Sequence, residues 1–352
     1  MDLQQAIAAV RPPCEDSRVA VRTRFSEIAM PLGSLGLLQD AVAQIAAIRR
    51  TMRPSIAKRA VVMFCADNGV VAQGVTQCGQ EVTATVTENM GRGKSTVCLM
   101  AQHIGMDSFP VDIGVARDVQ GERILRRKIR YGTADMTKEP AMTRQEAVRA
   151  VEVGIALSEW CAAQGYDLLC GGEMGIGNTT TSAAVTAALT GADVETVTGR
   201  GAGLSTEGLA RKVCAIKTAL VLHQPDPNDP LDVLHKVGGL DIAGLAGLYL
   251  GAAACGLPVV LDGVISCAAA LIAVRLCPDA RGYLLAGHRS EEPAGALLLC
   301  ELELSPFITA GMRLGEGTGA VAAVSLLDLV FAAYDGMPSF AEAGVEAYQP
   351  LQ

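Results

Sequence analysis

The sequence has few aromatic side chains and little clustered positive charge. Aromatic residues make up 4% of its 352 positions, with a single tryptophan, whereas apolar residues make up 50% and glycine occurs 38 times. This composition predicts a large core of small residues with closely spaced backbones. The formal net charge is −8 and the basic run 123–130 is short, which argues against nucleic acid as a partner. We interpret that run as a solvated face.

Patterns typical of metal sites and disulfides are also missing. The 11 cysteines include no CxxC pair and form no Cys/His cluster with metal spacing. Several cysteines lie in apolar runs, where a reduced cysteine behaves as a small hydrophobe. These are Cys65, Cys170, Cys255, Cys267 and Cys300. With no signal peptide evident at the N-terminus, we expect a cytoplasmic protein without disulfides.

The stretch 242–261 carries no charge and is long enough to raise the question of a membrane helix. Gly247 and Gly251 have the GxxxG spacing of paired membrane helices. However, Gly256 and Pro258 divide the stretch into a helix and a short strand. We therefore expect a buried helix packed closely on a sheet, in a protein that does not span a membrane.

Short apolar runs alternate with helical segments along the chain. Helices are expected between the runs, including one over 143–164 that opens with a capping box. Residues 116–140 are charged and are expected to form an irregular surface excursion. The predicted buried strands are 60–64, 108–113, 166–169, 259–261 and 283–286. This alternation predicts an α/β fold with a doubly wound parallel sheet and right-handed crossovers.

The stretch 171–181, GGEMGIGNTTT, follows one of these strands and precedes a helix-forming segment. Asn178 and the threonines after it are suited to a helix N-cap, where free N–H groups attract anions. Because Glu173 would repel a phosphate, a sugar hydroxyl or a ring N–H is a further expected ligand. Positive φ angles and close approach to a ligand are expected at Gly171, Gly172, Gly175 and Gly177. An ordinary strand–helix turn is the alternative.

A second glycine-rich stretch, 199–212, precedes a helix. The amides of Gly201 and Gly203 are available to an anion, with Lys212 as a point charge. The alternative is a plain helix start capped by Ser205 or Thr206, with Lys212 in solvent.

Two strand ends carry further polar residues. Asp67-Asn68-Gly69 follows the first strand, where open α/β sheets place ligands, although an Asn-Gly turn also fits. His288 follows the last strand as either a site residue or a structural histidine.

The polar turns that follow parallel strands are expected to meet at one edge of the sheet. They bring amide-rich loops for a phosphate together with Glu173 and Glu316, each set among glycines. Two carboxylates without evident metal ligands suggest chemistry on a ribose or an N–H base. A glutamate buried there would have a raised pKa and could accept a proton near neutral pH.

The strings PLGSLG, ADNGV, GEMGIGNTT, GRGAGL, VGGLDIAG, PVVLDG, GHRSEE and RLGEGTGA, in this order between residues 31 and 329, resemble the nicotinate-nucleotide:dimethylbenzimidazole phosphoribosyltransferase family. The resemblance implies transfer of 5-phosphoribose from nicotinate mononucleotide to 5,6-dimethylbenzimidazole, giving α-ribazole phosphate and nicotinate for cobamide synthesis. It also implies a homodimer without a metal or organic cofactor. The implied fold is a Rossmann-like sheet, which we place at 55–288, with a small helical domain from 1–54 and 289–352.

The resemblance further implies roles for individual residues. Glu316 is the implied base that removes the N–H proton of the incoming azole, and Glu173 lies against the ribose. The implied phosphate and ribose site comprises Gly175, Gly177, Asn178, Thr179, Gly201, Gly203 and Lys212. Ser290 and Arg313 are expected near the nicotinate carboxylate. The implied pocket for the acceptor base comprises Cys78, Val86, Met174 and Leu314.

The sequence departs from the family pattern at three positions. Asn68 stands where many members have histidine, and Val86 and Cys78 replace a glutamine and a serine familiar from enterobacterial members. The acceptor therefore stays open among dimethylbenzimidazole, benzimidazole, adenine and phenolic compounds. Two other classes remain as alternatives. One is a non-catalytic paralogue that supports a partner subunit in a heterodimer. The other is a transferase using phosphoribosyl pyrophosphate and Mg²⁺, whose paired acidic residues we do not find.

Overall fold

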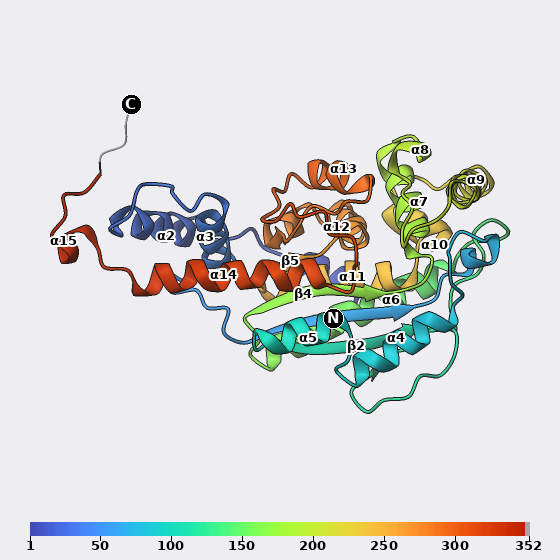
Figure 1. Ribbon diagram of the computed structural model, residues 1–352, viewed down its shortest axis with the longest axis horizontal. Helices are drawn as coiled ribbons and strands as arrows, with labels where there is room; N and C mark the ends of the chain where they lie inside the picture. The colour runs from blue at the N-terminus through green and yellow to red at the C-terminus, as the bar shows by residue number, and fades with distance from the viewer. Residues whose placement is uncertain (349–352) are drawn as a thin grey trace.

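In the computed structural model, which describes residues 1–348, a six-stranded parallel sheet lies between two layers of helices (Figure 1). In spatial order the strands are β3 (Leu125–Arg126), β2 (Asp107–Gly114), β1 (Arg59–Ala66), β4 (Leu168–Met174), β5 (Val259–Leu261) and β6 (Leu284–Ala286). The order reverses between β1 and β4, so the loops after these strands diverge and open a crevice at the carboxyl edge. The predicted doubly wound α/β fold is confirmed.

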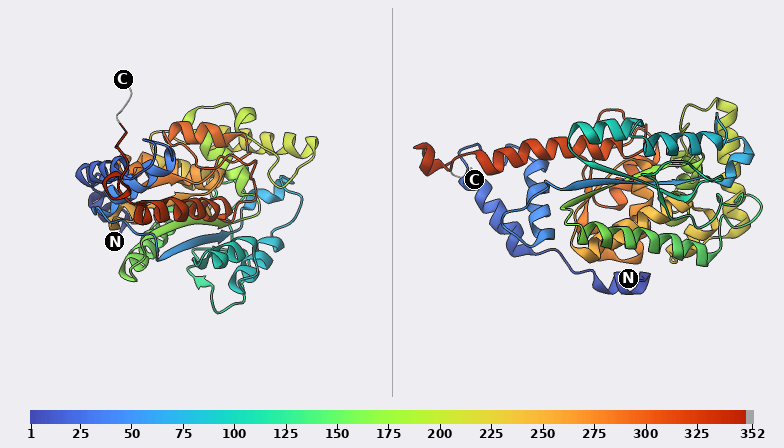
Figure 2. Two further views of the ribbon diagram at one scale, coloured as in Figure 1. Left: turned by 60° about the vertical axis from the view of Figure 1, so that its left-hand side comes forward. Right: turned by 90° about the horizontal axis from the view of Figure 1, so that it is seen from below.

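Helices cover both faces of the sheet. One face is covered by α6 (Arg144–Ala163), α11 (Leu240–Cys255) and α12 (Val264–Leu276), and the other by α4 (Glu81–Gly91), α5 (Thr96–His103) and α14 (Thr318–Gly336). Figure 2 shows the red α14 and the teal helices on one side of the sheet and the green α6 on the other. The remaining helices are α1 (Leu3–Ala9), α2 (Glu15–Glu27), α3 (Leu37–Arg49), α7 (Asn178–Thr190), α8 (Val194–Val197), α9 (Thr206–His223), α10 (Pro230–Val237), α13 (Ala294–Glu301) and α15 (Phe340–Ala343), with 3₁₀ turns η1 (Gly69–Gln73) and η2 (Pro278–Tyr283).

The helices α6 and α11 pack with their backbones in contact. A Cβ atom on Gly247 would lie 1.8 Å from the carbonyl oxygen of Val151, and one on Gly154 would lie 2.1 Å from that of Gly244. The GxxxG spacing therefore serves close packing inside a globular core. The expected buried helix and short strand over 242–261 are confirmed as α11 and β5.

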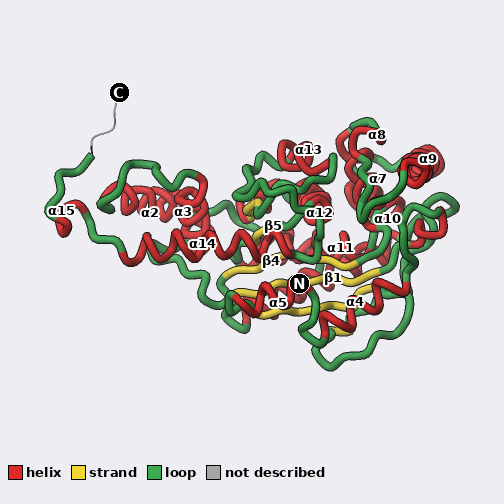
Figure 3. Tube along the Cα trace, in the orientation of Figure 1, coloured by secondary structure: helices red, strands yellow, loops and turns green. Residues whose placement is uncertain are grey.

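The two ends of the chain meet beyond the sheet. The helices α2 and α3 lie beside the far half of α14, and Figure 3 shows this end as helices and loops. The rings of Phe25 and Tyr334 are 4.9 Å apart, and their cluster continues into the core under β1. The division into domains at residues 54/55 and 288/289 stays a prediction, and residues 349–352 of the expected C-terminal cap lie outside the described residues.

Among residues 1–348, α14 is the one helix long and apolar enough to cross a membrane by length and composition. Core helices of globular proteins pass the same test, and 50% of the tested window of α14 is buried inside the fold. We therefore interpret α14 as a core helix.

Three expectations about outer segments of the chain are wrong. The segment 116–140 contains the edge strand β3 and the buried residues Val119, Ile124 and Met136, so it is not simply an excursion. Its Lys128 lies 3.1 Å from the buried carboxylate of Asp112, so the basic run is not wholly solvated. Cys300 is exposed, because it lies on the outer side of α13, whereas Leu298 and Leu299 beside it are buried.

Candidate active site

A pocket of about 460 Å³ opens at the carboxyl edge of the sheet. Its walls come from the segment after η1, helix α4, the loops after β4, β5 and β6, the loop before α9 and the turn before α14. The predicted site residues that line it are Cys78, Val86, Glu173, Met174, Gly175, Gly177, Asn178, Thr179, Gly201, Gly203, Ser290, Arg313, Leu314 and Glu316. Lys212 lies behind this wall and reaches it through Thr179. The structure thus brings the predicted residues together.

The glycines of the β4 loop act differently from the expectation. The strand continues to Met174, and only Gly177 of the four glycines has a positive φ, at 95°. Gly171 and Gly172 instead allow close packing. Their Cβ atoms would lie 2.4 Å from the Tyr249 hydroxyl and 2.3 Å from the Glu316 carbonyl oxygen. The turn that carries Glu316 therefore rests directly on β4.

The sequence predicts Asn178 as the N-cap of α7, but Gly177 occupies that position. The side-chain Nδ2 of Asn178 instead donates hydrogen bonds to Glu173 and to Asp241, the latter at 3.0 Å. Asp241 is the second residue of α11 and is fully buried. The amide of Asn178 therefore joins two carboxyl groups from different elements of the fold.

Glu173 is buried in this cluster, and its ionisation is shifted. Burial, helped by the charge of Asp241, raises the pKa of Glu173 to about 8, while the Asn178 hydrogen bond opposes the shift. Its Oε1 also accepts from the backbone N–H of Glu316 at 3.4 Å. A carboxyl group with this pKa is largely protonated at pH 7 until positive charge approaches it.

Glu316 lies in a strained turn. It has a φ of 63°, in the left-handed region that a side chain disfavours, between Gly315 at 86° and Gly317 at 99°. Such a conformation costs about 1–3 kcal/mol and persists where surrounding contacts hold it. Its Oε2 accepts from the backbone N–H of Val97 at 3.4 Å, and burial raises its pKa.

Asp262, at the end of β5, holds this turn from below. Its carboxylate accepts hydrogen bonds from the backbone N–H groups of Gly317 at 3.1 Å and Gly319 at 2.7 Å, at the start of α14. The Nδ1 atom of His288 lies 3.7 Å from the same carboxylate. His288 is buried and lines the pocket beside Asp262, so it is one of the residues that form the pocket wall.

The region of the pocket that is expected to bind the phosphate contains the buried side chain of Lys212. The alternative that placed Lys212 in solvent is wrong, because the side chain is fully buried. Its Nζ donates to Thr179 Oγ1 at 2.7 Å and to the carbonyl oxygen of Gly199 at 3.0 Å. Burial lowers the pKa of Lys212 to about 8, and the nearby charge of Glu292 opposes this shift.

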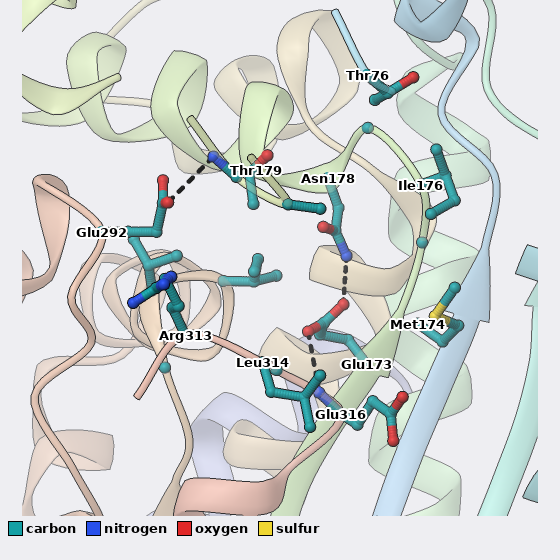
Figure 4. Close-up of a pocket in the computed structure, with 18 of the residues that line it drawn as sticks. Thr76, Glu173, Met174, Ile176, Asn178, Thr179, Glu292, Arg313, Leu314 and Glu316 are labelled. Carbon is teal, nitrogen blue, oxygen red and sulfur yellow. Dashed lines mark hydrogen bonds between the residues drawn. The ribbon is translucent and has the colours of Figure 1, made fainter. Parts of the chain in front are cut away.

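The carboxylate of Glu292 already occupies part of the expected phosphate site. The backbone N–H of Gly201, expected to bind an anion, donates to Glu292 Oε1 at 3.1 Å. Figure 4 shows Glu292 and Arg313 on one side of the pocket, opposite Glu173 and Asn178. The loop is therefore built to hold negatively charged oxygen at the position that Glu292 fills.

Sequence reasoning did not assign four residues of this region, although each lies inside a quoted string. They are Arg200 in GRGAGL, Asp241 in VGGLDIAG, Asp262 in PVVLDG and Glu292 in GHRSEE. For Asp241, Asp262 and Glu292, a position next to a strand end or a helix start was the available signal.

Comparison with other proteins places the chain in a family. A family model described as "Phosphoribosyltransferase" matches residues 10–345. A relative from Acetivibrio thermocellus is 47% identical over 330 residues, covering 94% of each chain. One from Chloroflexus aggregans is 49% identical over 344 residues, covering 97% of this chain and 98% of the relative. Both are named nicotinate-nucleotide–dimethylbenzimidazole phosphoribosyltransferase.

The chain belongs to this phosphoribosyltransferase family. A crystal structure of CobT from Thermus thermophilus has a TM-score of 0.90 and 40% identity, and the match covers 95% of this chain and 100% of that one. The family resemblance inferred from the quoted strings is therefore confirmed over nearly the whole chain.

The departures from the phosphoribosyltransferase pattern fall in two places. Asn68 is buried behind the pocket, where its Nδ2 donates to the carbonyl oxygen of Ile176 at 3.4 Å. Cys78 and Val86 line the pocket itself. The Asn68 change therefore affects the supporting wall, whereas the other two change the surface that a ligand meets.

Proposed function

We propose that the protein transfers the 5-phosphoribosyl group of nicotinate mononucleotide to 5,6-dimethylbenzimidazole or a related base. The products are nicotinate and an α-ribotide for cobamide synthesis. The observation that carries the proposal is one pocket that combines Glu316, Glu173 and the loop supported by Lys212. The names of relatives 47% and 49% identical to this chain support the same reaction.

In the proposed reaction, Glu316 is the base. A nitrogen of the azole attacks the anomeric carbon, and the bond from that carbon to the pyridinium nitrogen breaks. The bonding electrons neutralise the nicotinate ring, so its departure needs no acid, while the azole N–H proton passes to Glu316. Burial raises the pKa of Glu316, which makes its carboxylate a better proton acceptor near neutral pH. Attack opposite the leaving group gives the α-anomer.

Glu173 and Asn178 are proposed to face the ribose. As the anomeric carbon gains positive charge, the field of that charge favours the ionised form of Glu173, which then stabilises the sugar cation. Gly175 and Gly177 keep side chains away from this wall. On the opposite side, Ser290 and Arg313 are proposed to contact the nicotinate carboxylate.

The 5-phosphate is proposed to bind at the loop of Gly201 and Gly203, with Thr179 between it and the buried Lys212. Positive φ angles of 53° and 101° at these two glycines expose the loop backbone to the pocket. Because the Glu292 carboxylate accepts from the Gly201 N–H, the arriving phosphate has to replace it there.

The acceptor end of the pocket favours an apolar flat base. Cys78, Val86, Met174 and Leu314 line it without a charged group, and Glu316 supplies the proton acceptor. The exocyclic amine of adenine would lose its water there and find an apolar wall at Val86, which costs about 1–3 kcal/mol. We therefore propose dimethylbenzimidazole as the preferred acceptor.

The direct test is a product assay in the presence of a metal chelator. Purified protein is incubated with nicotinate mononucleotide and, separately, dimethylbenzimidazole, benzimidazole, adenine and p-cresol. Release of nicotinate with an α-ribotide, fastest with dimethylbenzimidazole, is the expected result. Activity that requires phosphoribosyl pyrophosphate and Mg²⁺ would favour the general transferase. Nucleotide binding without any product would favour a non-catalytic paralogue.

We further propose that the enzyme acts in the cytoplasm as a homodimer. A shallow hollow of about 300 Å³ lies between α5 and α14, lined by Leu99, Met100, His103, Ile104, Val321 and Ser325. Within this hollow Leu99 is 57% exposed, and Leu329, which follows Ser325 by four residues on α14, is 69% exposed. Exposed apolar side chains gathered on two adjacent helices are typical of a subunit interface.

A further inference from the structure

A buried amide holds two carboxyl groups together behind the pocket. Asn178 Nδ2 donates to Glu173 on β4 and to Asp241 on α11. An amide nitrogen has two N–H donors, so this pairing uses both. Figure 4 shows the side-chain oxygen of Asn178 on the other side, toward the pocket. The orientation of this amide therefore decides whether the pocket meets an acceptor or a donor.

Asp241 is held firmly in place. A Cβ atom on Gly175 would lie 2.7 Å from its Oδ2, and one on Gly239 would lie 2.4 Å from its Oδ1. The residue is 0% exposed, and Oδ1 has no hydrogen-bond partner among residues 1–348. A buried, poorly satisfied carboxylate destabilises a fold, and the packing of two glycines around it indicates a purpose beyond stability.

We propose that Asp241 is a positioning residue that keeps the Asn178 amide nitrogen toward Glu173 and its oxygen toward the pocket throughout the ionisation of Glu173. Identifying the ligand at that oxygen as a ribose hydroxyl rests on the proposed function. The orientation itself is a property of the protein without substrate.

Glu173 alone does not fix the amide. When ionised, Glu173 only accepts hydrogen bonds, but when protonated it can donate to the Asn178 oxygen, and the amide can then turn over. The pKa of Glu173 is raised to about 8 and that of Asp241 to about 6, in both cases mainly by burial. Asp241 therefore stays an acceptor over the range in which Glu173 titrates.

The other charged groups around the pair are also acidic. Asp262 raises the pKa of Glu173, and Asp67 raises that of Asp241. Glu316 contacts Glu173 through its backbone N–H, and its carboxylate points to Val97 instead. With several carboxyl groups in one buried region, the proton resides on Glu173, where burial and the charge of Asp241 act together.

The first test is nuclear magnetic resonance of the ligand-free protein. The side-chain amide signal of Asn178 is assigned by its loss in Asn178→Ser, and its hydrogen exchange is followed about one pH unit below and above the Glu173 pKa of about 8. We expect protection at both values in the wild type. Because Asp241→Asn removes the charge that helps to raise the pKa of Glu173, this variant is measured about one pH unit below and above its own Glu173 midpoint. Residue 241 can then donate or accept, so protection is expected only above that midpoint. Equal protection at both values in this variant would overturn the proposal.

The second test is the pH dependence of kcat/KM. Asp241→Ala should lower kcat/KM by about 10²-fold, the usual effect of a small misplacement at a reacting centre. Asp241→Asn should approach wild-type kcat/KM above the Glu173 midpoint and lose activity below it. A uniform loss of kcat/KM at all pH values in Asp241→Asn would contradict the proposal. If Asp241→Ala does not fold, Asp241→Asn alone tests the proposal.

A matched control is Asp112→Asn, which removes a buried carboxylate that contacts Lys128 and Val115 at the end of β2. It should leave Asn178 exchange and the shape of the pH profile unchanged. Because the exchange measurement needs no substrate, its failure overturns the role of Asp241. Absence of product with every acceptor in the wild type would instead overturn the proposed function alone.

Discussion

At the residue scale, the two glutamates of the site differ in the groups that surround their carboxylates. Glu173 lies among Asp241, Asn178 and the backbone of the Glu316 turn, whereas the Glu316 carboxylate has a backbone N–H neighbour at the edge of the pocket. The more enclosed group keeps its proton to higher pH. The less enclosed one is ionised earlier and is free to accept a proton from a ligand.

Glu316→Gln should lower kcat by about 10² to 10⁴, the contribution of a general base, and leave the affinity for nicotinate mononucleotide nearly unchanged. Stopped assays of nicotinate release and calorimetric titration with the nucleotide measure the two quantities. Glu301→Gln, on the outer helix α13, is the control and should behave as the wild type. Turnover near the wild-type rate in Glu316→Gln would remove Glu316 as the base.

The same carboxylate predicts the acid side of the pH profile. Glu316 accepts a proton only when ionised, and burial raises its pKa. Activity should therefore fall as the pH drops through that raised pKa, above the pH at which an exposed glutamate would titrate. This fall in activity at low pH should be absent from the residual activity of Glu316→Gln. A fall that persists unchanged in this variant would have to come from another group.

Lys212→Met should weaken the affinity for nicotinate mononucleotide while changing kcat little, because the lost charge acts on the phosphate rather than on the reacting atoms. The exposed Lys217 lies on the same helix and pairs with Glu195, so Lys217→Met is the matched control. Calorimetry on both variants separates the effects. Equal affinities would place the phosphate elsewhere in the pocket.

At the element scale, patterns confined to one segment were predictable, whereas long-range contacts were not. The strand runs and the capping box of α6 follow from local sequence, and both are present. The strand β3 has two residues and exists because it pairs with β2, which no local pattern reports.

Gly171 and Gly172 in β4, together with Asp241 and Asp262, show the same limit within the site. Gly171 and Gly172 suggest a turn when considered alone, but they are glycine because Tyr249 and Glu316 pack against them. Asp241 and Asp262 border an apolar stretch in the sequence. Their hydrogen bonds to Asn178 and to the start of α14 depend on elements far along the chain.

Gly247→Ala tests the close packing of α6 on α11. The added Cβ would lie 1.8 Å from a backbone oxygen of Val151, which no rotamer change relieves, so the helices have to move apart. We expect the free energy of unfolding to fall by about 1–3 kcal/mol, measured by urea denaturation.

The control for this change is Gly336→Ala at the end of α14, where a Cβ atom meets nothing within 4 Å among the described residues. It should change the free energy of unfolding by less than about 1 kcal/mol, in the stabilising direction. Similar losses in both variants would mean that the close approach of α6 and α11 is not what Gly247 provides.

At the scale of the whole molecule, α14 connects the reacting end to the chain termini. Its first residues are held by Asp262 beneath the Glu316 turn, and its far half packs on α3. Its outer face, with Leu329 exposed beside the hollow formed with α5, is the proposed contact between subunits. A dimer formed there would brace the helix whose start carries the proposed base.

Leu329→Asp should therefore shift the protein from dimer to monomer, because an ionised carboxylate placed in an apolar contact loses its water without a partner. Sedimentation equilibrium gives the mass of each species. Val221, 75% exposed on α9, provides the control Val221→Asp, which should remain dimeric. If Leu329→Asp becomes monomeric and kcat falls with it, the second subunit supports the Glu316 turn through α14. A monomer with full kcat would mean that the interface contributes to stability and not to catalysis. An unchanged mass would place the dimer contact on another face.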